Sequence, residues 1–187
     1  AVSSIKSKKP ETLTVLLSPQ GTRLTQEIFK ELSESRHLSL VCGRYEGIDD
    51  RFVDKYVDKE ISLGDYIISG GELGALILVD GITRILPGVL GSSKSVTNDT
   101  FENGLLKHPQ FTRPRIFEGE DIPEVLLSGN HEEILAYRFI ESVIRTLFRR
   151  PDLLKKKHFD KKQIKLLKKN GLYEKVMKEQ LDVKANK

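Results

Sequence analysis

The chain of 187 residues contains a single cysteine, Cys42, so it cannot form an internal disulfide framework. Its four histidines are scattered without the spacing of metal ligands, and no metal site is predicted. The apolar stretches are strand-sized or are interrupted by Gly, Asp and Arg, and the first residues lack the plan of a signal peptide. These absences exclude a disulfide-stapled or membrane-spanning protein, and we expect a cytoplasmic one.

Charge is divided unevenly along the chain. The formal net charge is +4, but residues 145–187 carry 15 Lys/Arg against 5 Asp/Glu, and residues 1–144 carry 16 against 22. An asymmetry of this size suggests a polyanionic partner, of which nucleic acid is the leading candidate. A lysine-rich helical face that only keeps the protein soluble would give the same pattern.

Apolar periodicity predicts alternating strands and helices in the first half of the chain. In order, these are strand Thr12–Leu17, helix Thr25–Leu32, strand Leu38–Val41, helix Asp50–Tyr56, strand Tyr66–Ser69 and helix Glu72–Leu86. Such alternation is typical of an α/β fold with a parallel sheet covered on both faces by helices. We therefore expect ligands to bind beyond the carboxyl ends of the strands.

Three glycine-bearing turns, Ser18–Gly21, Gly43–Gly47 and Ser69–Gly71, each follow a predicted strand. Because parallel strands end at one edge of the sheet, these turns can converge on one pocket. Carboxylates accompany the turns, at Glu46, Asp49, Asp50, Asp65 and Glu72. The lysine of a phosphate-binding loop is missing, so the pocket is predicted to suit a neutral or cationic ligand.

A polar segment without an apolar period, Gly91–Asn103, is typical of a flexible linker or lid. We predict a sheet domain over residues 1–91, a linker over 92–107 and a basic, all-helical domain over 108–187.

Two helices are predicted in the basic domain. Apolar spacing indicates one over His131–Arg149. The other covers Lys161–Lys169, where Asp160 and Gln163 have the spacing of a capping box and Gly171 ends the helix.

Six segments carry a resemblance to a known family: Leu17–Gly21, Val41–Asp49, Ile61–Gly74, Leu86–Gly91, His108–Pro114 and Val125–His131. In this order and spacing they resemble the bacterial tRNA (guanine-N1)-methyltransferases, which modify the guanine 3′ of the anticodon at position 37. The resemblance implies the SPOUT class of α/β fold, a deep trefoil knot, a homodimer with active sites at the subunit interface, and S-adenosylmethionine as the methyl donor. It begins partway into the family's sheet domain, so we expect the chain to lack an N-terminal portion.

The resemblance assigns two catalytic residues. Asp99 matches the family's catalytic aspartate, the general base that removes the proton from guanine N1. Arg84 matches the residue that stabilises negative charge on guanine O6. From the residues alone, a helix cap is the favoured interpretation of Asp99, whereas Arg84 is equally well explained as an ordinary charge at a helix end.

The donor site implied by the resemblance draws on all three turns. Its residues are Leu17, Ser18, Pro19, Gln20, Gly43, Tyr45, Glu46, Leu63, Gly64, Asp65, Tyr66, Ile67, Ile68, Gly70 and Gly71.

For the tRNA anticodon stem-loop, plausible phosphate contacts are Arg113, Arg115, Arg145, Arg149, Arg150 and Lys155–Lys157. Two other functions remain open from the residues alone. The basic tail is equally compatible with a noncatalytic RNA-binding module, and the glycine turns with an enzyme that uses a phosphate cofactor. The carboxylates beside the turns favour the methyltransferase over both alternatives.

Overall fold

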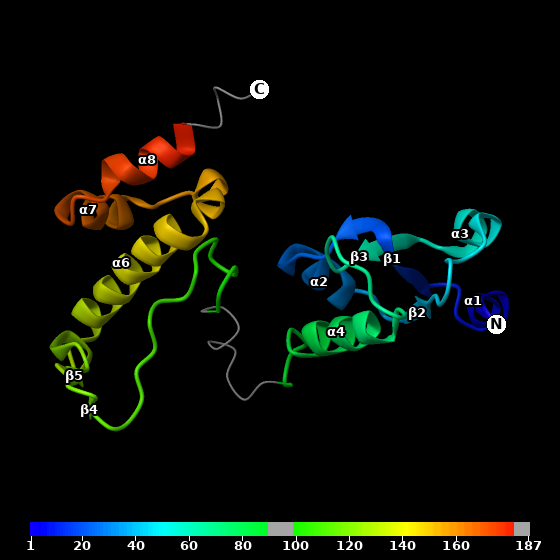
Figure 1. Cartoon of the computed structure of the whole chain (residues 1–187), viewed down its shortest axis with the longest axis horizontal. Helices are drawn as coiled ribbons and strands as arrows, with labels where there is room; N and C mark the ends of the chain where they lie inside the picture. The colour runs from blue at the N-terminus through cyan, green and yellow to red at the C-terminus, as the bar shows by residue number, and fades with distance from the viewer. Residues whose placement is uncertain (90–98, 182–187) are drawn as a thin grey trace. The chain divides into compact units, whose positions relative to one another are not determined.

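The computed structural model describes residues 1–89 and 99–181, and the chain divides between residues 96 and 97 into two units (Figure 1). The N-terminal unit contains α1 (Val2–Lys8), β1 (Leu13–Arg23), α2 (Gln26–Ser33), β2 (Leu38–Cys42), α3 (Asp50–Tyr56), β3 (Lys59–Ser62) and α4 (Glu72–Thr83). Its three strands form a parallel sheet in the order β2-β1-β3, with Val15 paired to Leu40 on one side and to Lys59 on the other. The predicted α/β class with a parallel sheet is confirmed.

The core of the N-terminal unit lies between the sheet and two helices, α2 and α4. It consists of Val15, Leu17, Leu32, Ile61, Leu78 and Ile82, all nearly inaccessible to solvent. Helix α2 begins where the Thr25 hydroxyl accepts the backbone N–H of Ile28, a capping interaction that the sequence favours. Gly81 of α4 faces the ring of Phe29 so closely that a Cβ would collide with it. The missing side chain therefore lets the two helices meet.

The first predicted turn is wrong, because β1 does not end at Leu17. The strand continues through Ser18–Gly21 to Arg23, although these four residues leave the ladder with β3. Both Leu17 and Thr22 are paired with Ile61, so the chain passes this one residue twice. Gly21 makes the passage possible, since a Cβ there would collide with the Glu60–Ile61 peptide. Pro19 and Gly21 therefore lie where β1 passes close to the backbone of β3, and not at the end of a strand.

The predicted strand Tyr66–Ser69 is also wrong. The third strand is β3, Lys59–Ser62, and it ends at a turn in which the Ser62 hydroxyl accepts the backbone N–H of Gly64 at 3.2 Å. Gly64 has a φ of 153°, which other residues rarely adopt. The apolar run after it is exposed, with Ile67 80% accessible, so no sheet buries it. An apolar run is a strand signal only where a neighbouring strand covers it.

Helix α4 ends at Thr83, earlier than the predicted Leu86. The backbone N–H groups of Ile85 and Leu86 bond to Ile82 and Thr83, three residues back. These tighter turns replace the last predicted helical turn ahead of Pro87.

The C-terminal unit contains β4 (Ile116–Phe117), β5 (Glu120–Asp121), the 3₁₀ turns η1 (Glu124–Leu126) and η2 (Pro151–Lys156), and α6 (His131–Arg149), α7 (Lys161–Lys169) and α8 (Tyr173–Leu181). Its core consists of Leu105, Ile140, Val143, Leu154, Leu167, Leu172 and Val176. The hairpin β4–β5 corrects the expectation that this region is all helical. Its turn residues, Glu118 and Gly119, both have positive φ, as a two-residue hairpin turn requires.

The helical predictions for this unit are confirmed. Helix α6 has the predicted bounds, and α7 begins with the complete capping box of Asp160 and Gln163. It ends where Gly171, at a φ of 65°, lets the Leu172 N–H reach the Leu167 carbonyl at 2.9 Å. Residues 92–98 of the predicted linker lie outside the described residues. Among the helices that the structure describes, none has the length and apolar character needed to cross a membrane.

The crossing at Gly21 yields a stability prediction. We expect Gly21→Ala to lower the free energy of unfolding by about 3 kcal/mol, because the added methyl group would displace the backbone of β3. Gly88→Ala is the control, since Gly88 has open space for a Cβ and only its φ of 82° disfavours alanine. Its cost should be about 1 kcal/mol. Urea unfolding of both variants measures the difference, and equal costs would contradict the crowded crossing.

Candidate functional site

A pocket of about 710 Å³ lies in the N-terminal unit, within the size range of small-molecule sites. Its walls are the Leu16–Gln20 part of β1, the loop after β2, the loop after β3 and the start of α4. Of the fifteen residues predicted to bind the donor, fourteen line it and only Asp65 does not. The predicted convergence of three chain segments therefore occurs, although only Gly43–Gly47 directly follows the end of a strand.

Two of these loops are joined by their backbones. Arg44 and Gly70 form an antiparallel bridge, and the Gly71 N–H donates to the Gly43 carbonyl at 3.2 Å. A Cβ at Gly71 would lie 2.9 Å from the Cα of Cys42. Glycine is therefore required where α4 begins, and its close contact with the end of β2 holds the pocket together.

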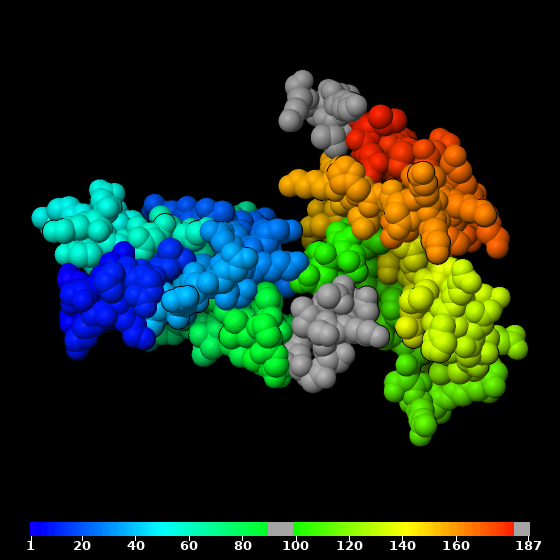
Figure 2. All heavy atoms as spheres, turned by 180° about the vertical axis from the view of Figure 1, so that it is seen from behind, coloured from blue at the N-terminus to red at the C-terminus, as the bar shows by residue number. Residues whose placement is uncertain are grey.

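The loop after β2 has an unusual backbone. Tyr45 has a φ of 61° and a fully exposed side chain, and Gly47 has a φ of 125°. This part of the chain stands at the surface of the unit (Figure 2, cyan). A tyrosine in the left-handed region costs about 1 kcal/mol or more, and such strain is concentrated at binding sites. The loop presents Tyr45 outward at the mouth of the pocket.

The pocket carries more negative than positive charge. Glu46, Asp50 and Glu60 line it, together with Arg44. The Arg44 guanidinium already pairs with Glu72, with an Nη2–Oε1 distance of 2.8 Å. The pKa of Glu72 is lowered by its own backbone N–H at the start of α4 and then by Arg44. This electrostatic environment suits a cation, as the sequence predicted.

Asp49, another of the carboxylates predicted beside the turns, stabilises helix α3. Asp49 caps α3 by accepting the Arg51 N–H at 2.9 Å, and it forms an ion pair with the Arg51 side chain. These bonds lower the pKa of Asp49.

Cys42 ends β2 beside the pocket. Burial raises the pKa of its thiol, and the charge of Glu72 raises it further. The protonated thiol is a poor nucleophile, in agreement with a packing role.

The two predicted catalytic residues belong to different units. Arg84 caps the C-terminus of α4 and is exposed, whereas Asp99 lies in the C-terminal unit. The Asp99 carboxylate is paired with Lys107 at 2.8 Å. Neither residue lines the pocket.

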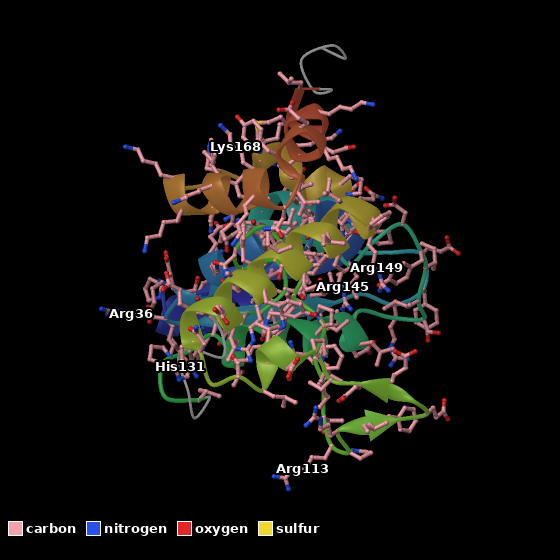
Figure 3. The ribbon with its side chains drawn as sticks, turned by 90° about the vertical axis from the view of Figure 1, so that its left-hand side faces the viewer. Arg36, Arg113, His131, Arg145, Arg149 and Lys168 are labelled. Atoms are coloured by element: carbon pink, nitrogen blue, oxygen red, sulfur yellow. The ribbon has the colours of Figure 1, made fainter. Side chains whose placement is uncertain are left out.

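The predicted RNA contacts differ in their surroundings. Arg115 is paired with Asp121, and Arg150 is paired with Asp152. Lys157 is half-buried, and desolvation lowers its pKa. Figure 3 shows Arg145 and Arg149 on the same helix, α6, and Arg113 near the β4–β5 hairpin.

Sequence reasoning did not single out the lysines of α7 as contacts. Five of them are exposed, namely Lys161, Lys162, Lys165, Lys168 and Lys169, while Leu167 of the same helix is buried. The i, i+3 and i+4 spacing of these lysines was the signal that could have identified the face.

Comparison with known proteins gives consistent matches. Residues 1–156 match the family described as tRNA (Guanine-1)-methyltransferase TrmD. A tRNA (guanine-N(1)-)-methyltransferase of Carboxydothermus hydrogenoformans is 47% identical over 169 residues, covering 90% of this chain and 66% of the relative. Those of Geobacillus kaustophilus and Listeria monocytogenes are each 48% identical, covering 90% of this chain and 69% of the relative. The chain thus spans about two thirds of the length of these relatives.

Proposed function

Because the chain belongs to the tRNA (guanine-1)-methyltransferase family, we propose that it transfers a methyl group from S-adenosylmethionine to N1 of the guanine 3′ of the anticodon, position 37. The observation that carries this proposal is the acidic pocket in the N-terminal unit, whose lining includes fourteen of the fifteen expected donor-binding residues. The names of the relatives state methylation of guanine N1 in tRNA, and the chain matches them over 90% of its length.

The pocket fits the methyl donor in shape and in charge. S-adenosylmethionine, when bound, supplies a methyl group attached to a positively charged sulfur. The loops joined at Gly43 and Gly71 bring main chain without side chains to the wall of the cavity, which suits close contact with an adenine and its ribose. Glu46 and the other lining carboxylates favour the sulfonium over a neutral ligand or a phosphate.

Asp99 and Arg84 have complementary roles in the proposed reaction. Asp99 accepts the proton that leaves guanine N1, so that the nitrogen lone pair forms the new N–CH₃ bond as the sulfur–carbon bond breaks. Arg84 donates hydrogen bonds to O6, where negative charge develops as the proton leaves. The sulfur departs as a neutral thioether, and the base retains the proton.

A homodimer is supported by the outer face of α4. Leu73, Leu76 and Ile77 are 61%, 63% and 44% exposed, although the opposite face of the helix is buried in the core. A helix that is apolar on all sides requires a cover on each side. We infer that a second copy of the chain covers this face. The trefoil knot is proposed from the family resemblance.

The C-terminal unit is the proposed tRNA surface. The exposed lysines of α7 and the arginines of α6 provide the positive charge that phosphate contacts require. Affinity for tRNA that depends on them should fall steeply as salt is added.

The basic unit would also suit a noncatalytic RNA-binding module, and a transfer assay separates the two functions. Labelled S-adenosylmethionine is incubated with a tRNA transcript carrying guanine at position 37, and with the same transcript carrying adenine there. Label should enter the first transcript only. Binding of both transcripts without transfer would support the RNA-binding module instead.

We expect Asp99→Asn to slow methyl transfer by about 10²- to 10⁴-fold, because the amide cannot accept the N1 proton. Affinity for tRNA should remain within about threefold, since a single charge that is partly accessible to water contributes little. Glu118→Gln, at the exposed hairpin turn, is the matched acid-to-amide control and should keep full activity. Single-turnover transfer measures the rates, and an active Asp99→Asn variant would remove the base assignment.

Glu46→Gln should weaken binding of S-adenosylmethionine by about fivefold, the equivalent of about 1 kcal/mol. Binding of S-adenosylhomocysteine, which lacks the positive charge on sulfur, should change less. Calorimetric titration of both ligands gives the difference. Equal losses of affinity for the two ligands would show that Glu46 does not interact with the positive charge on sulfur.

Leu76→Glu should convert the protein to a monomer, because it places a charge in the apolar face of α4. Leu135→Glu is the control, since Leu135 is 65% exposed on α6 of the other unit. Sedimentation velocity reports the oligomeric state. A dimer that survives the first substitution would exclude this face as the interface.

A further inference from the structure

The segment Asp99–Lys107, which contains the proposed base, is fastened to helix α6. Leu105 is 7% exposed and packs in the core with Ile140 and Val143. Beside it, the Leu106 N–H donates to the Thr146 hydroxyl at 2.9 Å. Thr146 is fully buried, and its own hydroxyl donates to the Ser142 carbonyl at 2.6 Å. Because that proton is committed to Ser142, the oxygen lone pairs face Leu106, and this end of the segment has a fixed attachment.

The segment also closes on itself. The Lys107 N–H donates to the Thr100 hydroxyl at 3.1 Å, and the Phe101 N–H donates to the Leu105 carbonyl at 3.1 Å. Phe101 has a φ of 74°, and the Arg150 guanidinium lies 5.8 Å from the centre of its ring. Both ends of the segment are therefore held together against the C-terminal end of α6.

Lys107 connects the backbone of this segment to the proposed base, Asp99. Its backbone is tied to Thr100, and its ammonium nitrogen lies 2.8 Å from Oδ1 of Asp99. The two side chains are 36% and 31% exposed, so water screens the pair only in part.

We propose that Lys107 is a positioning residue for methyl transfer, which holds the Asp99 carboxylate in the orientation from which it accepts the guanine N1 proton. The inference rests on the proposed function of Asp99 as the base. It adds that contacts within the C-terminal unit set the orientation of the base. Thr146 anchors Leu106, and the neighbouring Lys107 pairs with Asp99. Misplacement of a catalytic group by about 1 Å commonly costs up to about 10²-fold in rate.

The test compares Lys107→Met with Lys107→Arg in single-turnover methyl transfer at saturating tRNA. The methionine variant should react about tenfold more slowly, while its Kd for tRNA stays within about threefold of the unaltered chain. The arginine variant, which keeps the charge, should recover most of the rate. Lys175→Met, an exposed lysine of α8, removes the same charge and should change neither quantity.

A second measurement reports the ion pair without reference to activity. In thermal unfolding, Asp99→Asn, Lys107→Met and the double variant form a cycle, and a coupling between the two sites is expected. An active chain whose rate is unchanged or faster with Lys107→Met would overturn the inference, as would additive changes in stability. Absence of transfer by the unaltered chain would instead remove the proposed function, and the role of Lys107 with it.

Discussion

Close contact between backbones at the carboxyl edge of the sheet is the constraint on which the pocket depends. Gly71 rests against Cys42 at the end of β2, and Gly21 passes over the Glu60–Ile61 peptide. Neither position has room for a side chain, so segments distant in sequence meet through main-chain atoms. Main-chain contacts vary little in length or direction, which gives the cavity a defined shape before any ligand enters. The strained Tyr45 is tolerated because the bridge between Arg44 and Gly70 holds its loop.

The pocket of the N-terminal unit is acidic and helix α7 of the C-terminal unit is basic, so each suits a different ligand. The pocket is lined by Glu46, Asp50 and Glu60, whereas α7 exposes five lysines. Carboxylates beside a polyanion weaken its binding, so an acidic pocket in a tRNA enzyme requires a compensating gain. The proposed cationic methyl donor would provide that gain. The thioether product would lack the positive charge on sulfur, so these carboxylates would hold it less strongly, which favours its release after transfer.

The sequence predicted the local structure wherever a short-range signal decides it. The capping box of α7 and the bounds of α3 and α6 depend on neighbouring residues. The errors arise where partners distant in sequence decide. Ser18–Gly21 looks like a turn unless the passage beside β3 is known, and Tyr66–Ser69 looks like a strand unless its exposure is known. The roles of Asp99 and Arg84 came from family resemblance alone and remain predictions.

The attachment of the Asp99 segment to α6 has a consequence for the order of events. Thr146, which anchors the segment, lies on α6 between Arg145 and Arg149, two of the proposed phosphate contacts. A tRNA that binds these arginines therefore contacts the helix that carries the base. The donor pocket, in contrast, is formed within the N-terminal unit and needs no tRNA for its shape. Under the proposed roles of these residues, the order is therefore donor binding first and tRNA binding second.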